Sequence, residues 1–305
     1  MEASGYQNSA MPPLPENWLA RIAPGLFVIL WSTGFIGAKY GLPYAEPFTF
    51  LSVRMGFGFA LFAVIVLITR PVWPPGKLIL HSAVTGWLAQ VLYLSGVFIS
   101  IHLGLPAGLS ALIPGLQPVL TSTIANRWLG ERVGPLQWGG LVLGVLGVYL
   151  VVEGRLQIGG TLPGAWLAIV VALIGITLGA LYQKRFCTGV DLRISMLVQL
   201  GAAELLFVPA AFLFETRDIA WTPDFIFAVA WMVLVLSFGT NLLLFWLIRR
   251  SAATRVASLF YLTPAVTALM AWFLFGESLD ALSLIGMAVC AVAVLLVNVR
   301  WAFSR

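Results

Sequence analysis

The chain is built from apolar runs of about 20 residues, each long enough to cross the hydrocarbon core of a lipid bilayer. Short polar stretches separate ten such segments. The segments lie near 22–39, 47–69, 78–100, 105–126, 134–152, 162–182, 193–214, 225–247, 253–275 and 281–299. A segment in lipid must satisfy its own backbone hydrogen bonds, so each is expected to be a helix. We therefore predict an all-α integral membrane protein with ten transmembrane helices.

Composition excludes the soluble alternatives. Hydrophobic residues make up 60% of the chain and charged residues only 10%, whereas an ordinary soluble domain carries about 25% charged residues. A transmembrane β-barrel would show segments of about ten residues with strict alternation, and that pattern is absent. The only cysteines, Cys187 and Cys290, predict neither a disulfide framework nor a metal cluster.

Orientation follows from the lysines and arginines of the short loops. On the side that both termini share lie Arg21, Arg70, Lys77, Arg127, Arg132, Lys184, Arg185, Arg193, Arg249, Arg250, Arg255, Arg300 and Arg305. The opposite side holds only Lys39, Arg155 and Arg217. This asymmetry predicts that both termini are cytoplasmic and that the number of spans is even. The positive charges then anchor the topology, and we expect no nucleic-acid partner.

The chain also resembles itself at a shift of 145 or 146 residues. The matching pairs are Pro118 with Pro264, Gly130-Glu131 with Gly276-Glu277, Gly140 with Gly286, and Val53–Gly56 with Val198–Gly201. Each half would hold five helices. Because five is odd, the second half would enter the membrane from the opposite side, which predicts two inverted repeats and alternating access.

We divide the chain accordingly into two repeats with short ends. Residues 1–20 form a cytoplasmic lead-in, 21–152 the first repeat, 153–300 the second repeat, and 301–305 a cytoplasmic tail. The first apolar segment is expected to be retained as a helix, because no basic region precedes it and no small-residue cleavage site follows it.

Several residue strings resemble the drug/metabolite transporter superfamily, in the branch with two EamA domains. They are Trp31–Lys39, Glu46-Pro47 followed by Arg54, the Pro118 helix ending in Leu129-Gly-Glu-Arg132, and the Pro264 helix ending in Phe275-Gly-Glu-Ser278. The resemblance implies ten helices, cytoplasmic termini, a central cavity between the halves, and export of metabolites such as amino acids or of toxic compounds. It leaves the substrate open.

Two ionisable residues lie inside apolar segments, where a charge is costly and needs a reason. Arg54 lies about eight residues, or about 12 Å, from the outer end of the second span. We predict a gating or structural role for it. Glu204 lies near the middle of the seventh span and is a candidate for proton coupling. Its alternative is a carboxyl group that stays protonated and hydrogen-bonded.

Polar and aromatic residues within the spans are the candidates for a substrate cavity. They are Trp31, Trp87, Gln90, Tyr93, Gln117, Asn241 and Tyr261. Gln90 and Tyr93 share a helix face at a spacing of three, with Trp87 one turn earlier. The prolines inside spans, Pro114, Pro118 and Pro264, can be hinges of moving helices or static kinks.

The sequence holds no Walker phosphate loop, no HExxH and no nucleophile elbow, so we expect no enzyme activity, cofactor or metal. The predicted function is a secondary transporter in a bacterial inner membrane, most simply an exporter of amino-acid-like or amphipathic metabolites. Its expected partners are the substrate, the bilayer and, as a candidate, protons, with no obligate protein partner. Multidrug efflux by the same fold is the alternative. An intramembrane lipid enzyme and a non-transporting membrane subunit are weaker rivals.

Overall fold

The computed structural model describes residues 19–105, 110–111, 113–130, 133–153, 163–275 and 281–298. The elements in these ranges are helices, and the one β-type contact among them is an isolated bridge between Ala45 and Ile219. The all-helical class predicted from the apolar runs is therefore confirmed for the described part of the chain. The Gly-Glu turns predicted at Glu131 and at Gly276-Glu277 lie outside the described residues, as do both predicted terminal segments up to residue 18 and from residue 299.

The helices of the first half follow the predicted apolar segments. They are α1 (Leu19–Gly41), α2 (Pro47–Thr69), α3 (Gly76–Gly86), the π-helical η1 (Trp87–Leu92), α4 (Tyr93–His102), the 3₁₀ turn η2 (Pro114–Leu116), α6 (Gln117–Trp128) and α7 (Pro135–Glu153). The elements α3, η1 and α4 form one continuous helical rod. Its middle has the wider i→i+5 turn that is characteristic of a π-helix.

The second half repeats this order. Its elements are α8 (Pro163–Phe186), α9 (Leu192–Phe214), α10 (Pro223–Trp231), the π-helical η3 (Met232–Thr240), α11 (Asn241–Arg250), α12 (Ala253–Ser258), the 3₁₀ turn η4 (Leu259–Tyr261), α13 (Leu262–Phe275) and α14 (Ala281–Asn298). Here α10, η3 and α11 form the continuous rod that corresponds to α3, η1 and α4.

Element positions recur at a shift of 145 residues. The bounds of α2 and α9 differ by 145 at both ends, and so do the first residues of the two π-helical segments, Trp87 and Met232. The 3₁₀ turns η2 and η4 are likewise related by 145. The irregular turns, which carry no hydrophobic pattern of their own, therefore recur together with the long helices.

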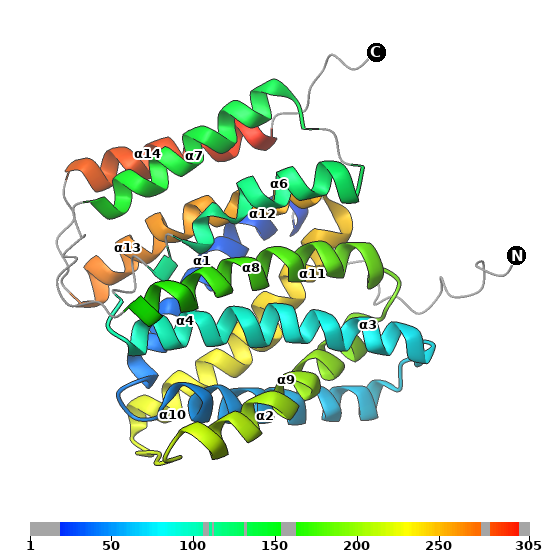
Figure 1. The fold of residues 1–305 in the computed structure, drawn as a ribbon. Helices are drawn as coiled ribbons and strands as arrows, with labels where there is room; N and C mark the ends of the chain where they lie inside the picture. Colours follow the sequence, from blue (N-terminus) through cyan, green and yellow to red (C-terminus); the bar gives the residue numbers. More distant parts are fainter. Residues whose placement is uncertain are drawn as a thin grey trace, which may run out of the picture.

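Helices that correspond under this shift pack against each other at the two edges of the bundle. Figure 1 shows α2 beside α9 along one edge and α7 beside α14 along the opposite edge. The backbones of α7 and α14 approach closely: a Cβ added at Gly147 would lie only 2.8 Å from the backbone nitrogen of Cys290. Small residues allow this approach where apolar side chains would hold the backbones apart.

The outer surface of the bundle is apolar. Leu67 is 72% exposed and Phe273 is 80% exposed, as expected for side chains that face lipid. Seven helical stretches of the described chain are long and apolar enough to cross a membrane. They are Ile22–Gly41, Pro47–Thr69, Gly76–His102, Pro163–Phe186, Leu192–Phe214, Pro223–Arg250 and Ala253–Leu274. The protein is therefore a multi-pass membrane protein.

The other three predicted spans are less complete. Pro135–Leu150 and Leu284–Val297 are shorter apolar helices, and the predicted fourth span includes residues 106–109 and 112, which lie outside the described ranges. In Figure 1 the first residues of α1 and the last residues of α14 point toward the same end of the bundle. This arrangement fits an even number of crossings.

Candidate functional site

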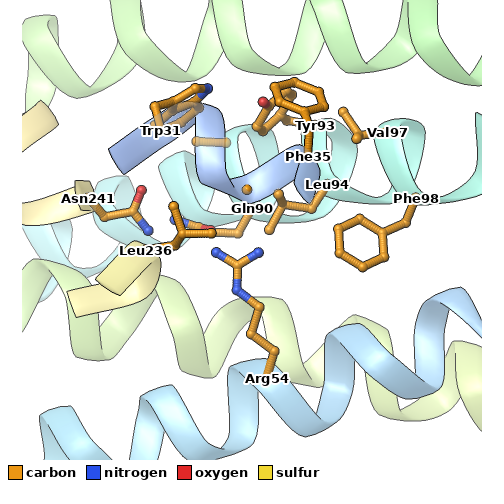
Figure 2. A pocket seen from close by; sticks show the side chains of 12 residues that line it. Trp31, Phe35, Arg54, Gln90, Tyr93, Leu94, Val97, Phe98, Leu236 and Asn241 are labelled. Carbon is orange, nitrogen blue, oxygen red and sulfur yellow. The ribbon is translucent and has the colours of Figure 1, made fainter. Parts of the chain in front are cut away.

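A cavity of about 470 Å³ lies inside the bundle near the middle of α1. Twelve residues line it: Trp31, Gly34, Phe35, Arg54, Ala89, Gln90, Tyr93, Leu94, Val97, Phe98, Leu236 and Asn241. They come from α1, α2, the rod of η1 and α4, and the rod of η3 and α11 (Figure 2). Both halves of the chain therefore contribute to its wall. Hollows that are largely apolar with a few convergent polar groups are typical of small-molecule sites.

The charged group of the cavity is the guanidinium of Arg54. The side chain is only 4% exposed, and its Nε donates a hydrogen bond to Ser237 Oγ at 3.2 Å. Figure 2 shows the guanidinium extending from α2 toward Gln90 and Leu236. No carboxylate pairs with Arg54 within the described part of the chain. A buried charge without a counter-charge is unfavourable in free energy. Arg54 is therefore the group of this cavity that a bound anion would stabilise most.

Aromatic rings form the wall opposite Arg54. The rings of Trp31 and Tyr93 are stacked, with centroids 5.8 Å apart and planes inclined by 20°. Phe260 meets Trp31 edge-on at 5.1 Å and supports it from behind. Both ring contacts are geometries in which aromatic side chains stabilise each other. The wall therefore presents aromatic rings together with the Tyr93 hydroxyl and the Trp31 indole N–H.

Two amides complete the polar lining. Gln90 lies in the π-helical η1, and Asn241 is the first residue after the π-helical η3. Neither side chain forms a hydrogen bond to another residue in the described ranges, although both are buried. The π-helical turns place these amides on the cavity wall, a recurring use of such turns at functional sites. The cavity thus offers one cation, two free amides and an aromatic face.

Five of the residues predicted to carry transport therefore meet in one cavity, namely Trp31, Arg54, Gln90, Tyr93 and Asn241. Three other cavity candidates do not line it. Trp87 is 40% exposed and donates its indole N–H to the carbonyl of Ala202 at 3.0 Å. Tyr261 is fully buried and donates its hydroxyl to the carbonyl of Leu141 at 2.8 Å.

Gln117 lies in a second, smaller hollow between the two halves. The space is about 280 Å³, and its walls include Leu244, Val256 and Phe260. The side-chain oxygen of Gln117 is buried there without a hydrogen-bond partner among the described residues.

The three prolines predicted as hinges lie at the starts of helical elements. Pro114 begins η2, Pro118 is the second residue of α6, and Pro264 is the third residue of α13. Their function as hinges stays a prediction.

Glu204 lies outside the cavity, between α9 and α2. Its Oε1 accepts a hydrogen bond from Ser52 Oγ at 3.0 Å, while Oε2 is buried with no partner in the described ranges. Ser52 and Arg54 are two positions apart on α2 and so face different directions. The two predicted ionisable residues therefore act separately and do not form an ion pair.

A reciprocal clamp at one end of the bundle was not predicted. Glu46 Oε2 accepts hydrogen bonds from the N–H and the hydroxyl of Thr216, both at 2.7 Å. In return Glu215 accepts from the N–H groups of Phe48 and Thr49 and from the hydroxyl of Thr49, all at 2.7 Å. We call this set the Glu46–Glu215 clamp. It joins the start of α2 to the end of α9 and thus one half of the chain to the other.

The clamp has an electrostatic consequence for Glu46. The hydrogen bonds from the Thr216 side chain and backbone hold the pKa of the Glu46 carboxyl below its ordinary value of 4.5. The carboxylate of Glu215 is stabilised as well. It binds N–H groups at the N-terminus of α2, where the helix dipole favours negative charge. Sequence reasoning could have singled out Glu46-Pro47 as a helix start, but its partners lie 170 positions away.

The EamA-like transporter family matches this chain twice, over residues 25–153 and 162–299. The chain belongs to the EamA-like transporter family. Membership makes it a multi-pass membrane transporter and confirms the resemblance drawn from the Pro and Gly-Glu strings. The two matches divide the chain where the structure divides it, between α7 and α8.

Several relatives of this EamA-family chain are known by sequence. It is 29% identical to the "Uncharacterized transporter YvbV" of Bacillus subtilis, over 95% of this chain and 94% of that protein. It is 24% identical to the "Uncharacterized inner membrane transporter YedA" of Escherichia coli, over 88% and 87%. The "Probable amino-acid metabolite efflux pump" of Salmonella typhimurium is 27% identical, over 90% and 92%.

A solved crystal structure shares the fold of this EamA-family chain. The match has a TM-score of 0.73 at 19% sequence identity, and it covers 92% of this chain and 96% of the other. The likeness extends over almost the whole of both chains, so the arrangement of helices is that of a known fold.

Proposed function

We propose that this protein is a secondary-active or facilitative exporter of small metabolites that works by alternating access. The observation that carries the proposal is the cavity of Figure 2, which lies inside an apolar bundle and is lined from both halves of the chain. Polar and charged groups inside a membrane helix bundle are energetically costly. A buried site that collects them is therefore interpreted first as a binding site.

The recurrence at 145 residues supports the alternating-access part of the proposal. With five helices in each repeat, the second repeat is inverted relative to the first, which gives ten helices and two cytoplasmic termini in a bacterial inner membrane. In such transporters the repeats exchange conformations around a fixed central site. The pairing of corresponding helices at both edges of the bundle supports a cavity between the repeats, where this exchange would expose it.

The Glu46–Glu215 clamp supports a gate at the outer end. At the shift of 145 residues, Glu46 corresponds to Asp191 and Glu215 to Arg70. Asp191 binds Arg193 of its own helix, at 2.7 Å, rather than the first repeat. The carboxylate clamp thus joins the repeats at the outer end. At the opposite end they are joined by contacts without a carboxylate, from Arg185 to the carbonyl of Trp128 at 2.9 Å and between His81 and Tyr182 at 2.7 Å. We infer that the clamp closes the outer side, that its release opens it, and that the structure corresponds to the state closed toward the outside.

The lining supports amino-acid-like or amphipathic compounds as substrates. A relative carries the name of an amino-acid metabolite efflux pump, and aromatic rings and amides suit a ligand with an apolar part and a polar end. Efflux of varied toxic compounds is the second candidate, favoured by the four aromatic rings of the lining, those of Trp31, Phe35, Tyr93 and Phe98.

A transport screen in everted membrane vesicles tests the proposal. Vesicles containing the protein should accumulate at least one amino acid, organic acid or amphipathic compound faster than vesicles without it, and Trp31→Ala should reduce that accumulation. Imposing or collapsing a proton gradient reports the energy coupling in the same assay. No accumulation of any compound above control vesicles, with or without a gradient, would contradict export.

A further inference from the structure

We infer that the cavity selects organic anions, with Arg54 binding the carboxylate of a substrate that carries an aromatic or other apolar group and no ammonium group. The inference rests on the proposed transport function and deepens it by naming the substrate class. It differs from the zwitterionic amino-acid class that the family resemblance implies. The deciding feature is the charge of the cavity, which comes from one arginine.

Arg54 is available for a ligand. Of its guanidinium nitrogens only Nε has a described hydrogen bond, to Ser237 Oγ at 3.2 Å. The fork of N–H groups at the end of the side chain extends into the cavity toward Gln90 (Figure 2). A planar fork of this kind matches the two oxygens of a carboxylate, and such paired hydrogen bonds are among the strongest in proteins.

No acidic group balances Arg54 in the cavity. Its twelve lining residues include neither aspartate nor glutamate, and no lysine or histidine. The carboxyl group of Glu204, on the neighbouring helix α9, is hydrogen-bonded to Ser52 and does not line the cavity. The empty cavity therefore has an uncompensated positive charge in a low-dielectric environment, where an anion would be strongly favoured.

An ammonium group would have no matching partner. The other polar lining groups are the Gln90 and Asn241 amides and the Tyr93 hydroxyl, all of them neutral. Binding an ammonium group a few ångströms from Arg54 would place two positive charges together with no carboxylate from the protein between them. A zwitterion that enters this cavity must therefore desolvate its ammonium group without gaining a carboxylate partner from the protein.

The remaining space fits an apolar group. The stacked Trp31 and Tyr93 rings, with Phe98 and Val97 further along, form an apolar wall across the cavity from the guanidinium (Figure 2). A flat ring attached to a carboxylate by a short chain would place its ring against this wall and its oxygens on Arg54. Aryl-alkanoic acids and their branched aliphatic counterparts are the chemical class with that shape.

A matched series of ligands on one carbon skeleton tests this directly. The ligands are 3-phenylpropanoate, phenylalanine, 3-phenylpropanamide and 3-phenylpropylamine, and the protein is the full chain purified into lipid nanodiscs. Calorimetric binding should rank 3-phenylpropanoate about 10- to 100-fold tighter than phenylalanine and the amide, the factor expected for a charge-assisted hydrogen bond. The amine should bind most weakly. Equal affinities for the propanoate and phenylalanine would overturn the inference.

Variants separate the role of Arg54 from a fold defect. Arg54→Gln should lower the affinity for 3-phenylpropanoate to that for 3-phenylpropanamide. The amide should still bind to this variant, which would show that the cavity is intact. Arg217→Gln removes an exposed cation outside the cavity and should leave the ranking unchanged. If Arg54→Gln kept the wild-type preference for the propanoate, Arg54 would not be the anion site. Failure of every carboxylate to bind would overturn the inference, while transport of another metabolite in vesicles would leave the proposed function standing.

Discussion

The carboxylate of Glu46 holds both the backbone N–H and the hydroxyl of Thr216, each at 2.7 Å, although the two residues are 170 positions apart. These bonds and the reciprocal ones from Glu215 connect the two repeats at one end of the bundle through two carboxylates. In the proposed transport cycle they must break whenever the outer side opens.

Removing the clamp should therefore shift the protein toward an outward-open state. In the double variant Glu46→Gln and Glu215→Gln, weaker neutral hydrogen bonds replace the charge-assisted ones. Spin labels at the exposed positions Pro43 and Asp218, which lie in the two segments that the clamp joins, should then move apart in double electron–electron resonance. The same labels on the wild-type clamp provide the control. An unchanged distance distribution would show that the clamp does not control this end.

The clamp should also weaken in acid. The pKa of Glu46 in the clamp lies below its ordinary value of 4.5, so the ionised carboxylate favours the clamped state. This contribution is fully present above pH 4.5 and is lost as the pH falls through the lowered pKa of the clamped state. The distance between the two spin labels should rise over that acidic range. In Glu46→Gln the Glu46-dependent part of this rise should vanish.

Proton coupling makes a separate prediction for Glu204. Its Oε2 is buried without a described partner, and the side chain lies outside the cavity. Glu204→Gln should therefore abolish the dependence of transport on a pH gradient while ligand affinity changes less than about twofold, within the ordinary effect of a remote substitution. Transport that still follows the gradient in this variant would rule out Glu204 as the coupling site.

Substitution of the two tryptophans predicted for the cavity should have different effects on ligand affinity. Trp31 stacks on Tyr93 inside the cavity, so Trp31→Ala should weaken ligand binding about tenfold, or by about 1.4 kcal/mol. Trp87 bonds instead to the Ala202 carbonyl, so Trp87→Phe should leave ligand affinity unchanged. Its loss of one hydrogen bond should lower stability by about 1 kcal/mol. Calorimetry and thermal unfolding of both variants provide the measurements.

Close packing of α7 on α14 should be sensitive to a single methyl group. Gly147→Ala would place its Cβ 2.8 Å from the Cys290 backbone and should cost about 1–3 kcal/mol of stability. Gly139→Ala on the same helix is the matched control, because nothing lies within 4 Å of the added carbon. A thermal unfolding temperature that fell equally in both variants would contradict this account of the α7–α14 contact.

The sequence predicted the long helices well because hydrophobic length is a local property. The predicted segment 47–69 has the same bounds as α2, and 193–214 differs from α9 by one residue. The positions of Arg54 and Glu204 inside long transmembrane helices followed from their places in apolar segments, without any knowledge of their partners. Their separation could not be predicted, since it depends on which face of α2 meets which neighbouring helix.

Trp87 and Tyr261, two candidates that do not line the cavity, both lie in helical turns that depart from the α-helix. Trp87 and Gln90 were placed on one face by the α-helical spacing of three, but they lie in a π-helical segment whose turn is wider. Tyr261 lies in a 3₁₀ turn, which is tighter, and its side chain points toward α7 instead. Neither departure from the α-helix has a clear sequence pattern. The clamp was missed for a related reason, because its partners meet only in the folded chain.

In alternating access, the cavity opens to one side of the membrane at a time. A cysteine at Ala89, on the cavity wall, can be tested with a membrane-impermeant maleimide after the buried Cys187 and Cys290 are replaced by alanine. We predict that Ala89→Cys reacts from the cytoplasmic side while the clamp is intact, reacts from the outer side when Glu46 and Glu215 are both glutamine, and is protected by substrate in either case. Reaction from the same side with and without the clamp, or no protection by any transported compound, would contradict alternating access through this cavity.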